Sequence, residues 1–150
     1  MSIEELQSRI EALVRGEGNV RSREGRVVDD AIELLDEGAL RVCEPIDGEW
    51  VTNVWVKQAI LLSFARWDAE WMGNRERDAI VYFDKLPVKK NYKKLGVRCV
   101  PPGVARYGSF LGRGVILMPS FVNIGAYVDE GSMVDTWATV GSCEIGRAHV

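Results

Sequence analysis

The sequence predicts two regions of different fold class: an α+β N-terminal region, mainly helical with one hairpin, and a parallel β-helix built from hexapeptide repeats. Two observations carry this division. Apolar residues recur at helical spacing in the first half, whereas they recur every six residues in the second half. A chain of 150 residues is long enough for one domain or two small ones. We therefore expect domains at residues 1–99 and 100–143.

The composition is that of an ordinary globular protein, with 47% hydrophobic and 27% charged residues and a net charge of -3. No block of like charges is present, which argues against nucleic acid or an anionic membrane as the main partner. The longest apolar run, residues 59–62, is far shorter than the ~20 residues that span a bilayer. Cys43, Cys99 and Cys143 are too widely spaced for a metal or redox motif, so we expect reduced thiols and a cytoplasmic location.

Two helices are expected at the start of the N-terminal region. Ser2 followed by Glu5 resembles a capping box, and apolar residues then follow at helical spacing. A second helix is expected over residues 28–37, where Gly38 provides the C-terminal stop. Both helices present one apolar face, so we expect them to pack together.

A hairpin and a third helix are expected next. The Asp47-Gly48 dipeptide between residues 40–42 and 50–52 is typical of a hairpin turn. Residues 54–67 carry few charges and predict a mostly buried helix.

The end of the N-terminal region predicts mainly connecting segments. The sequence predicts a loop over residues 68–78 and an extended segment over residues 82–87. In the connector that follows, we expect Lys89, Lys90, Lys93 and Lys94 to form a solvated face.

The six-residue period begins at Val104. Every sixth residue from there is apolar, namely Val104, Phe110, Ile116, Val122, Val128, Val134 and Val140. The residue two places earlier is always small or compact, namely Pro102, Gly108, Gly114, Ser120, Ala126, Ser132 and Ala138. In a β-helix, one aliphatic residue per flat side points inward and stacks on the next coil, while tight turns favour small residues. An α-helix or a half-buried strand would instead show a period of about 3.6 or 2. An all-β domain with regular turns remains an alternative.

The repeat breaks at Gly146, where an inward aliphatic residue is expected. The codons of residues 144–150 can be written as a string that resembles a common sequencing adapter. We therefore expect these seven residues to be foreign to the native chain. His149, the only histidine, then carries no mechanistic weight.

Residues 118–143 closely resemble the central motif of the tetrahydrodipicolinate N-succinyltransferases, and residues 34–42, 59–64, 82–85 and 96–102 resemble other parts of that family. The resemblance implies an α+β N-terminal domain followed by a left-handed parallel β-helix, here truncated. It implies a homotrimer with active sites between neighbouring subunits. The implied reaction moves a succinyl group from succinyl-CoA to the amine of tetrahydrodipicolinate, in its open form 2-amino-6-oxopimelate, in lysine and diaminopimelate biosynthesis.

The same resemblance implies site residues. Arg98 matches a substrate-binding arginine of the family, although without the resemblance we would expect a surface arginine at the start of the β-helix. Asp135 matches a substrate-binding aspartate and is a candidate base, although alone it reads as a turn residue. The resemblance implies no metal and no permanently bound cofactor, with succinyl-CoA as co-substrate. We expect the CoA contacts mostly in the C-terminal half of the family's length. Asp129 and Glu130 could line the trimer interface, but a solvated turn is at least as strong an expectation for them. The interface or substrate pocket is a weaker expectation for Arg106, Tyr127 and Trp137.

Other functions remain open. Another hexapeptide acyltransferase would often use a catalytic histidine, for which the chain offers only His149. A γ-class carbonic anhydrase needs three histidines for zinc, which this segment lacks. A non-catalytic, truncated β-helix module is the remaining alternative. Because residues 101–143 supply only about two and a half coils, we expect these 150 residues alone to be inactive.

Overall fold

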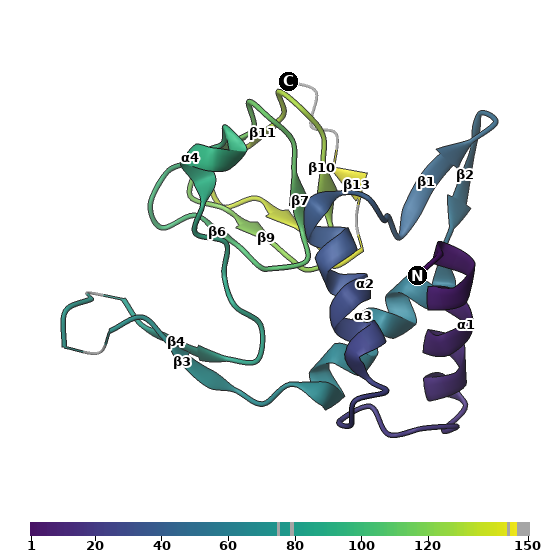
Figure 1. The fold of residues 1–150 in the computed structure, drawn as a ribbon. Helices are drawn as coiled ribbons and strands as arrows, with labels where there is room; N and C mark the ends of the chain where they lie inside the picture. Colours follow the sequence, from purple (N-terminus) through teal and green to yellow (C-terminus); the bar gives the residue numbers. More distant parts are fainter. Residues whose placement is uncertain (75, 79, 144, 147–150) are drawn as a thin grey trace.

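The computed structural model describes residues 1–74, 76–78, 80–143 and 145–146, the last two by their backbone only. Three helices and a hairpin lie on one side of the molecule, and short parallel strands wind on the other (Figure 1). The expectation of a foreign tail concerns residues 144–150, most of which lie outside the described residues. Within the described part, no helix is long and apolar enough to cross a membrane.

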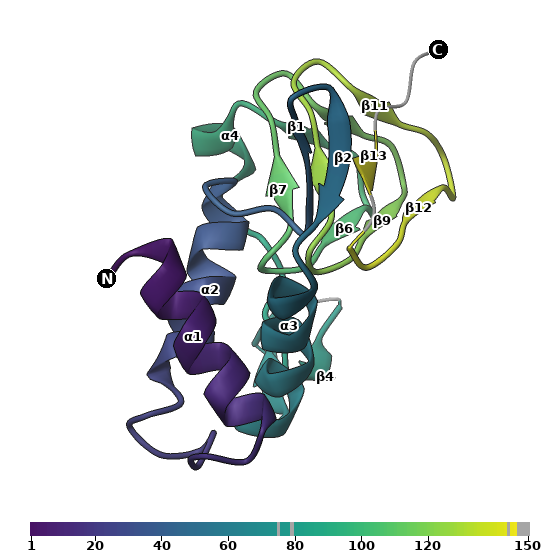
Figure 2. The same ribbon diagram turned by 90° about the vertical axis from the view of Figure 1, so that its right-hand side faces the viewer.

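The expected helices are confirmed as α1 (Ile3–Val14), α2 (Arg26–Glu37) and α3 (Val54–Arg66). The Ser2 hydroxyl accepts a hydrogen bond from the Glu5 amide at 3.2 Å, which is the predicted N-cap. Gly38 ends α2 in the left-handed conformation, with φ of 75°. The buried faces of the three helices share one apolar core, and Figure 2 shows α1 and α3 side by side.

The expected hairpin consists of β1 (Cys43–Ile46) and β2 (Glu49–Thr52), paired antiparallel. Its turn is the predicted dipeptide, because Asp47 and Gly48 both have positive φ, at 50° and 85°. The first strand begins at Cys43, after the predicted segment 40–42 rather than within it.

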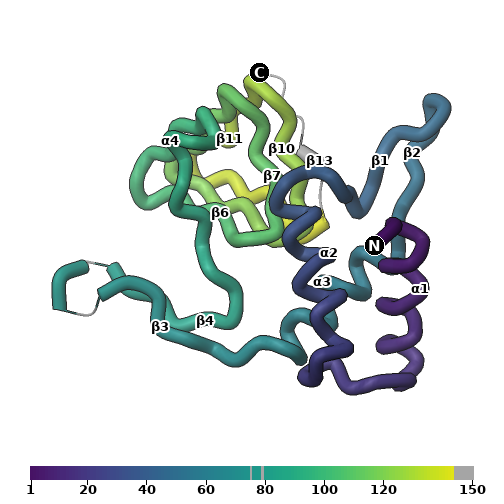
Figure 3. Tube along the Cα trace, viewed as in Figure 1, coloured from purple at the N-terminus to yellow at the C-terminus, as the bar shows by residue number. Residues whose placement is uncertain are grey.

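A second antiparallel ribbon, the arm, pairs β3 (Glu70–Met72) with β4 (Tyr82–Asp84) and projects away from the helices (Figures 1 and 3). The extended segment at 82–87 is therefore confirmed over its first half. The prediction of a loop over 68–78 is wrong at β3, where the aromatic rings of Trp71 and Phe83 lie 5.0 Å apart. Such cross-strand aromatic contacts stabilise short ribbons.

The second half forms three parallel sheets. Their strands are β5 (Arg98–Cys99), β6 (Val104–Ala105), β7 (Phe110–Leu111), β8 (Ile116–Leu117), β9 (Phe121–Val122), β10 (Tyr127–Val128), β11 (Met133–Val134), β12 (Thr139–Val140) and β13 (Ile145–Gly146). The sheet orders are β5-β8-β11, β6-β9-β12 and β7-β10-β13, so every third strand pairs. This is the strand order expected at the start of a parallel β-helix.

The structure corrects the phase of the first repeats. Val104, Phe110 and Ile116 were expected inside, but they are only partly buried, and their neighbours Ala105, Leu111 and Leu117 are buried instead. From Val122 onward the predicted inward residues are buried as expected. The frame moves because the inward residues Leu117 and Val122 are five residues apart instead of six. Paired residues are accordingly 17 apart in some strand pairs and 18 in others.

The two halves are joined by a buried ion pair. The connector includes a short helix, α4 (Tyr92–Leu95), which the sequence did not predict. Lys89 was expected on a solvated face, but its side chain is only 5% exposed and its ammonium donates to Asp36 Oδ1 at 2.6 Å. The same carboxylate oxygen accepts the Gly108 amide at 2.7 Å. A buried ammonium requires such a partner, so the α2 residue Asp36 fixes the connector and the first coil to the helices.

Candidate functional site

The sheet β5-β8-β11 presents an outer face on which both predicted site residues lie. Arg98, Ile116 and Met133 are direct partners across the three strands. Cys99, Leu117 and Val134, the next residue along each strand, are also direct partners. Because side chains alternate along a strand and Leu117 and Val134 are buried, the residues on either side of them face outward.

Arg98 is held at one edge of this face by its backbone. Its amide donates to the carbonyl of Val115 at 3.0 Å, and the amide of Val100 donates to the carbonyl of Leu117 at 2.8 Å. Its side chain is exposed, and within the described residues its guanidinium makes no ion pair. A fixed backbone with a free guanidinium is suited to bidentate binding of a carboxylate from solution.

Asp135 follows the inward Val134 and is exposed. Its Oδ1 accepts the amide of Thr136 at 2.6 Å, and its carbonyl accepts the amide of Ala138 at 3.0 Å. The aspartate therefore stabilises its own turn, as expected for an aspartate in a turn. That bond uses one carboxylate oxygen and fixes the direction of the group, which leaves the other oxygen available to an outside donor.

The residues between Arg98 and Asp135 are apolar. On the outer face the first row is Arg98, Ile116 and Met133, and the second row is Val100, Met118 and Asp135. The two charged residues thus occupy opposite corners. With ordinary spacing between and along strands, their Cα atoms lie about 12 Å apart. The sequence prediction missed this apolar strip because it placed Ile116 inside, and the adjacent apolar residues Ile116 and Leu117 do not show which of the two faces inward.

Trp137 stands next to this face, at the turn after Asp135. It is 77% exposed and has a φ of 61°, although the matching turn residues one and two repeats earlier are Gly131 and Gly125. Its amide donates to the carbonyl of Pro119 at 2.6 Å, which anchors the turn to the preceding coil. A bulky residue rarely adopts this conformation, so the chain places an indole at the rim of the face at a cost in backbone strain.

Two other residues proposed for an interface or pocket have partners within the chain. Arg106 donates to Asn123 Oδ1 at 3.0 Å and forms an ion pair with Asp84. Tyr127 stacks on Phe110, with ring centroids 4.5 Å apart, and the guanidinium of Arg41 lies 3.4 Å from its ring centroid. Both therefore help to bind the N-terminal region to the other two sheets.

Asp129 and Glu130 lie in an exposed turn. Asp129 Oδ1 accepts the amide of Glu130 at 2.8 Å, the same local bond that Asp135 makes one repeat later. Asp129 is thus a geometric match for Asp135 that lies beyond β10, in a different sheet from β11.

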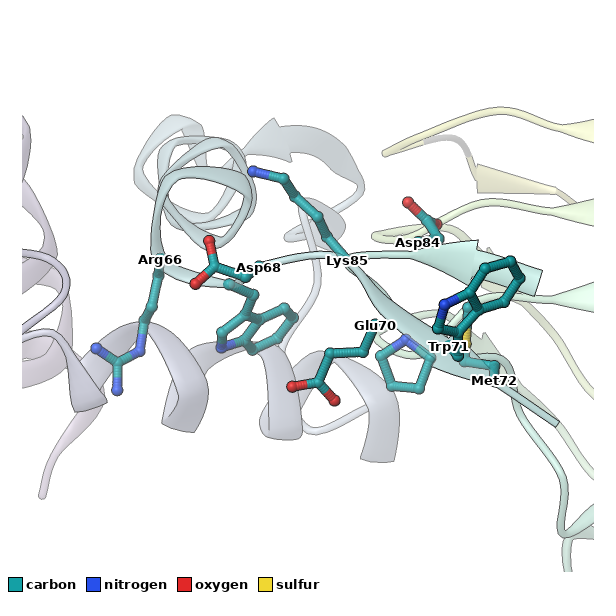
Figure 4. Close-up of a pocket in the computed structure, with 9 residues that line it drawn as sticks. Arg66, Asp68, Glu70, Trp71, Met72, Asp84 and Lys85 are labelled. Atoms are coloured by element: carbon teal, nitrogen blue, oxygen red, sulfur yellow. The ribbon is translucent and has the colours of Figure 1, made fainter. Parts of the chain in front are cut away.

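A separate pocket of about 380 Å³ lies at the base of the arm (Figure 4). Its labelled charged side chains point in different directions rather than toward one point. Three of them have partners elsewhere, since Arg66 pairs with Asp29, Asp68 with Arg21, and Asp84 with Arg106. Neither Arg98 nor Asp135 lines it. The arrangement is that of a structural junction rather than of a site that gathers functional groups.

The described residues offer no metal site, and the Cys99 thiol is not activated. Among them, no group of three or more histidine, cysteine or acidic residues could hold a metal ion. Burial raises the pKa of the Cys99 thiol, which keeps it protonated and poorly nucleophilic near neutral pH. Burial also raises the pKa of Tyr92 to about 12, with a further contribution from Cys99. Both groups belong to the packing beneath the first coil.

Comparison with known proteins identifies relatives over most of the chain. Residues 3–65 match the family described as "Tetrahydrodipicolinate N-succinyltransferase N-terminal". A relative from Acinetobacter baylyi, named 2,3,4,5-tetrahydropyridine-2,6-dicarboxylate N-succinyltransferase, is 50% identical over 129 residues, which cover 81% of this chain and 46% of the relative. A relative of the same name from Polynucleobacter asymbioticus is 52% identical over 128 residues, covering 80% and 46%.

A third relative of that name, from Bradyrhizobium diazoefficiens, is 44% identical over an alignment that covers all of this chain and 58% of the relative. The chain spans about half the length of the curated relatives it matches. The matches extend through the parallel strands as well as the helical region. The chain belongs to the tetrahydrodipicolinate N-succinyltransferase family.

Proposed function

We propose that the protein containing this chain transfers a succinyl group from succinyl-CoA to the amine of tetrahydrodipicolinate, in its open form 2-amino-6-oxopimelate. The reaction belongs to the succinylase branch of lysine and diaminopimelate biosynthesis. The observation that carries the proposal is about 50% identity to relatives whose names state this reaction. The outer face of β5-β8-β11 supports it, because an arginine and an aspartate lie there at opposite corners.

The chemistry needs no nucleophilic side chain, since the acceptor amine itself attacks the thioester carbonyl. The new N–C bond forms as the C–S bond breaks, and the thiol of CoA leaves with a proton. Before attack, the ammonium group of the acceptor must lose a proton, and Asp135 is the proposed base. Arg98 is proposed to hold a carboxylate of the acceptor, which places the amine for attack.

We also propose that the three parallel sheets close into a left-handed β-helix and that three copies form a homotrimer. Pairing of every third strand supports the coil. Active sites would then lie between neighbouring subunits, with succinyl-CoA as co-substrate along the β-helix. The CoA contacts are proposed to lie mostly in the part of the relatives' length that this chain does not span.

The test is thiol release from succinyl-CoA by the intact protein when tetrahydrodipicolinate is added. Asp135→Asn and Arg98→Ala should each lower kcat/KM by at least ~100-fold, the range for loss of a base or of a positioning contact. Asp129→Asn is the matched control, because Asp129 makes the same bond to its own turn. It should leave the rate within about two-fold.

Two other outcomes would change the assignment. Near-normal rates in Asp135→Asn and Arg98→Ala, with thiol release intact, would reject the site but keep the reaction. Absence of thiol release with tetrahydrodipicolinate, together with release on another amine or hydroxyl acceptor, would favour another hexapeptide acyltransferase. Absence of release with every acceptor would favour a non-catalytic β-helix module.

A further inference from the structure

The hairpin β1-β2 carries apolar side chains that are open to solvent. Trp50 is 61% exposed, Ile46 is 46% exposed and Val51 is 39% exposed, and every residue of β2 is exposed. A two-stranded hairpin on its own is only marginally stable in water. Exposed apolar side chains that gather on one element mark a surface that another segment covers.

The chain that leads into the hairpin runs along the outer side of the sheet β7-β10-β13. Gly38 packs closely on Phe110 of β7, so that a Cβ at this glycine would lie 2.5 Å from the ring. Arg41 lies over Tyr127 of β10, with its guanidinium 3.4 Å from the ring centroid. Between Gly38 and Arg41 the chain therefore advances from β7 to β10, toward the last strand of the sheet, and β1 begins directly afterwards at Cys43.

The hairpin stands beside the edge at which this sheet would grow. In Figure 1, β7, β10 and β13 follow one another toward the hairpin, which stands beyond β13. Figure 2, viewed from that side, shows the hairpin in front of these strands. A parallel β-helix extends by adding a strand to each sheet at the open edge of its last coil. Further strands of this sheet would therefore lie opposite the hairpin.

One face of the hairpin is directed toward the coils. Cys43 pairs with Thr52 and Pro45 pairs with Trp50, and because side chains alternate along a strand, these four residues share a face. At the base of that face, Cys43 packs against the apolar core that includes Ile124 of the coils. Trp50 lies on the same face farther from the base, so its indole is directed toward the place that further strands would occupy.

We infer that the hairpin β1-β2 covers the outer side of the strands that follow β10 in this sheet of the intact protein, with Trp50 as the central contact. The covered strands belong to the segment that follows Cys143. The relatives have the length to supply them, because this chain covers 46% of the Acinetobacter baylyi relative and its family match is to the N-terminal part. The contact rests on the proposed β-helix and is independent of the acceptor and of the residues Arg98 and Asp135.

Photo-crosslinking of the intact protein tests the contact. In Trp50→p-benzoylphenylalanine, irradiation should give a product with the mass of one chain, in which position 50 is joined to a peptide from beyond residue 143. Trp71→p-benzoylphenylalanine is the matched control, because Trp71 is a similarly exposed tryptophan, at 54%, on the other antiparallel ribbon. The arm projects away from the hairpin (Figure 1), so this variant should give no link to that segment.

The other products would overturn the inference. A main product of twice the chain mass would assign the hairpin to a second copy. Links from position 50 to residues 1–143 alone would mean that the hairpin folds back on the coils described above. Absence of any link would mean that the hairpin stays in solvent.

Hydroxyl-radical labelling of the unsubstituted intact protein provides a readout that needs no variant. If Trp50 passes from 61% exposed to the exposure of a core side chain, its oxidation should be at least about five-fold slower than in a peptide of residues 43–53. Oxidation within about two-fold of the rate in the peptide, as expected from the exposed area of Trp50 in this chain alone, would overturn the inference.

Discussion

Replacing Asp36 with alanine removes both contacts that its carboxylate makes with the second half of the chain. The Lys89 ammonium, 2.6 Å away on a side chain that is 5% exposed, loses its counter-charge. The Gly108 amide loses its acceptor. Removing one partner of a buried ion pair costs about 3–5 kcal/mol, because the remaining charge stays buried. We expect Asp36→Ala to lower the free energy of unfolding by that amount.

The reciprocal change, Lys89→Met, provides the control. It keeps most of the volume of the side chain and removes the buried charge, while Asp36 remains 23% exposed to water and still accepts from Gly108. We expect a loss of less than about 2 kcal/mol. Urea unfolding of the intact protein at neutral pH, followed by circular dichroism, measures both values. Equal losses below about 1 kcal/mol in the two variants would refute the reasoning.

Three further predictions concern the parallel sheets. In urea unfolding, Leu117→Ala should lower the free energy of unfolding by about 2–5 kcal/mol and Ile116→Ala by less than about 1 kcal/mol, because only Leu117 points inward. The reverse order would support the repeat frame predicted from the sequence. Gly112→Ala should lower the free energy of unfolding by about 1–3 kcal/mol, because a Cβ there would lie 2.5 Å from the Glu130 amide nitrogen. A Cβ at Gly131 would meet no atom within 4 Å, so Gly131→Ala should cost only the backbone strain of its positive φ, roughly 1 kcal/mol. Burial raises the pKa of Tyr92 from 10.0 to about 12. The protonated phenol therefore stabilises the folded state fully below pH 10, and this stabilisation is lost as the pH rises toward 12. In Tyr92→Phe, the urea midpoint should fall less steeply with pH between 10 and 12.

The period of six could be recognised from the sequence, but its phase could not. Phe110 and Leu111, like Ile116 and Leu117, are both apolar, so the sequence does not reveal which of each pair faces inward. Phe110 is apolar because it stacks on Tyr127 beneath the N-terminal region. That contact joins segments distant in sequence, and local patterning carries no trace of it.

The lysine at position 89 shows the same limit. Lysine is rarely buried, so a solvated position was the natural expectation. Its partner Asp36 is 53 residues away, on α2, and nothing near either residue marks the pair. By contrast, the Ser2 cap, the Gly38 stop and the Asp47-Gly48 turn depend on neighbouring residues only and were predicted.

The candidate site was predicted only in part. Arg98 and Asp135 were identified by resemblance to a family, and their shared face follows from strand register, which the shifted frame concealed. The apolar strip between them was not predicted, because Ile116, which was expected in the core, faces outward. A correct frame would have placed Ile116 outward beside Met133, but the adjacent apolar residues Ile116 and Leu117 leave that frame undetermined.

The central claim is that the acceptor binds on the outer face of β5-β8-β11, and methionine methyl NMR tests it most directly. The chain contains four methionines: Met118 and Met133 lie on that face, Met72 lines the pocket at the base of the arm, and Met1 lines a different cavity, beside α1 and α2. On addition of 2-aminopimelate to the intact protein, the methyl signals of Met118 and Met133 should shift, and those of Met72 and Met1 should stay in place. A shift of the Met72 signal with no change at Met118 or Met133 would contradict the account.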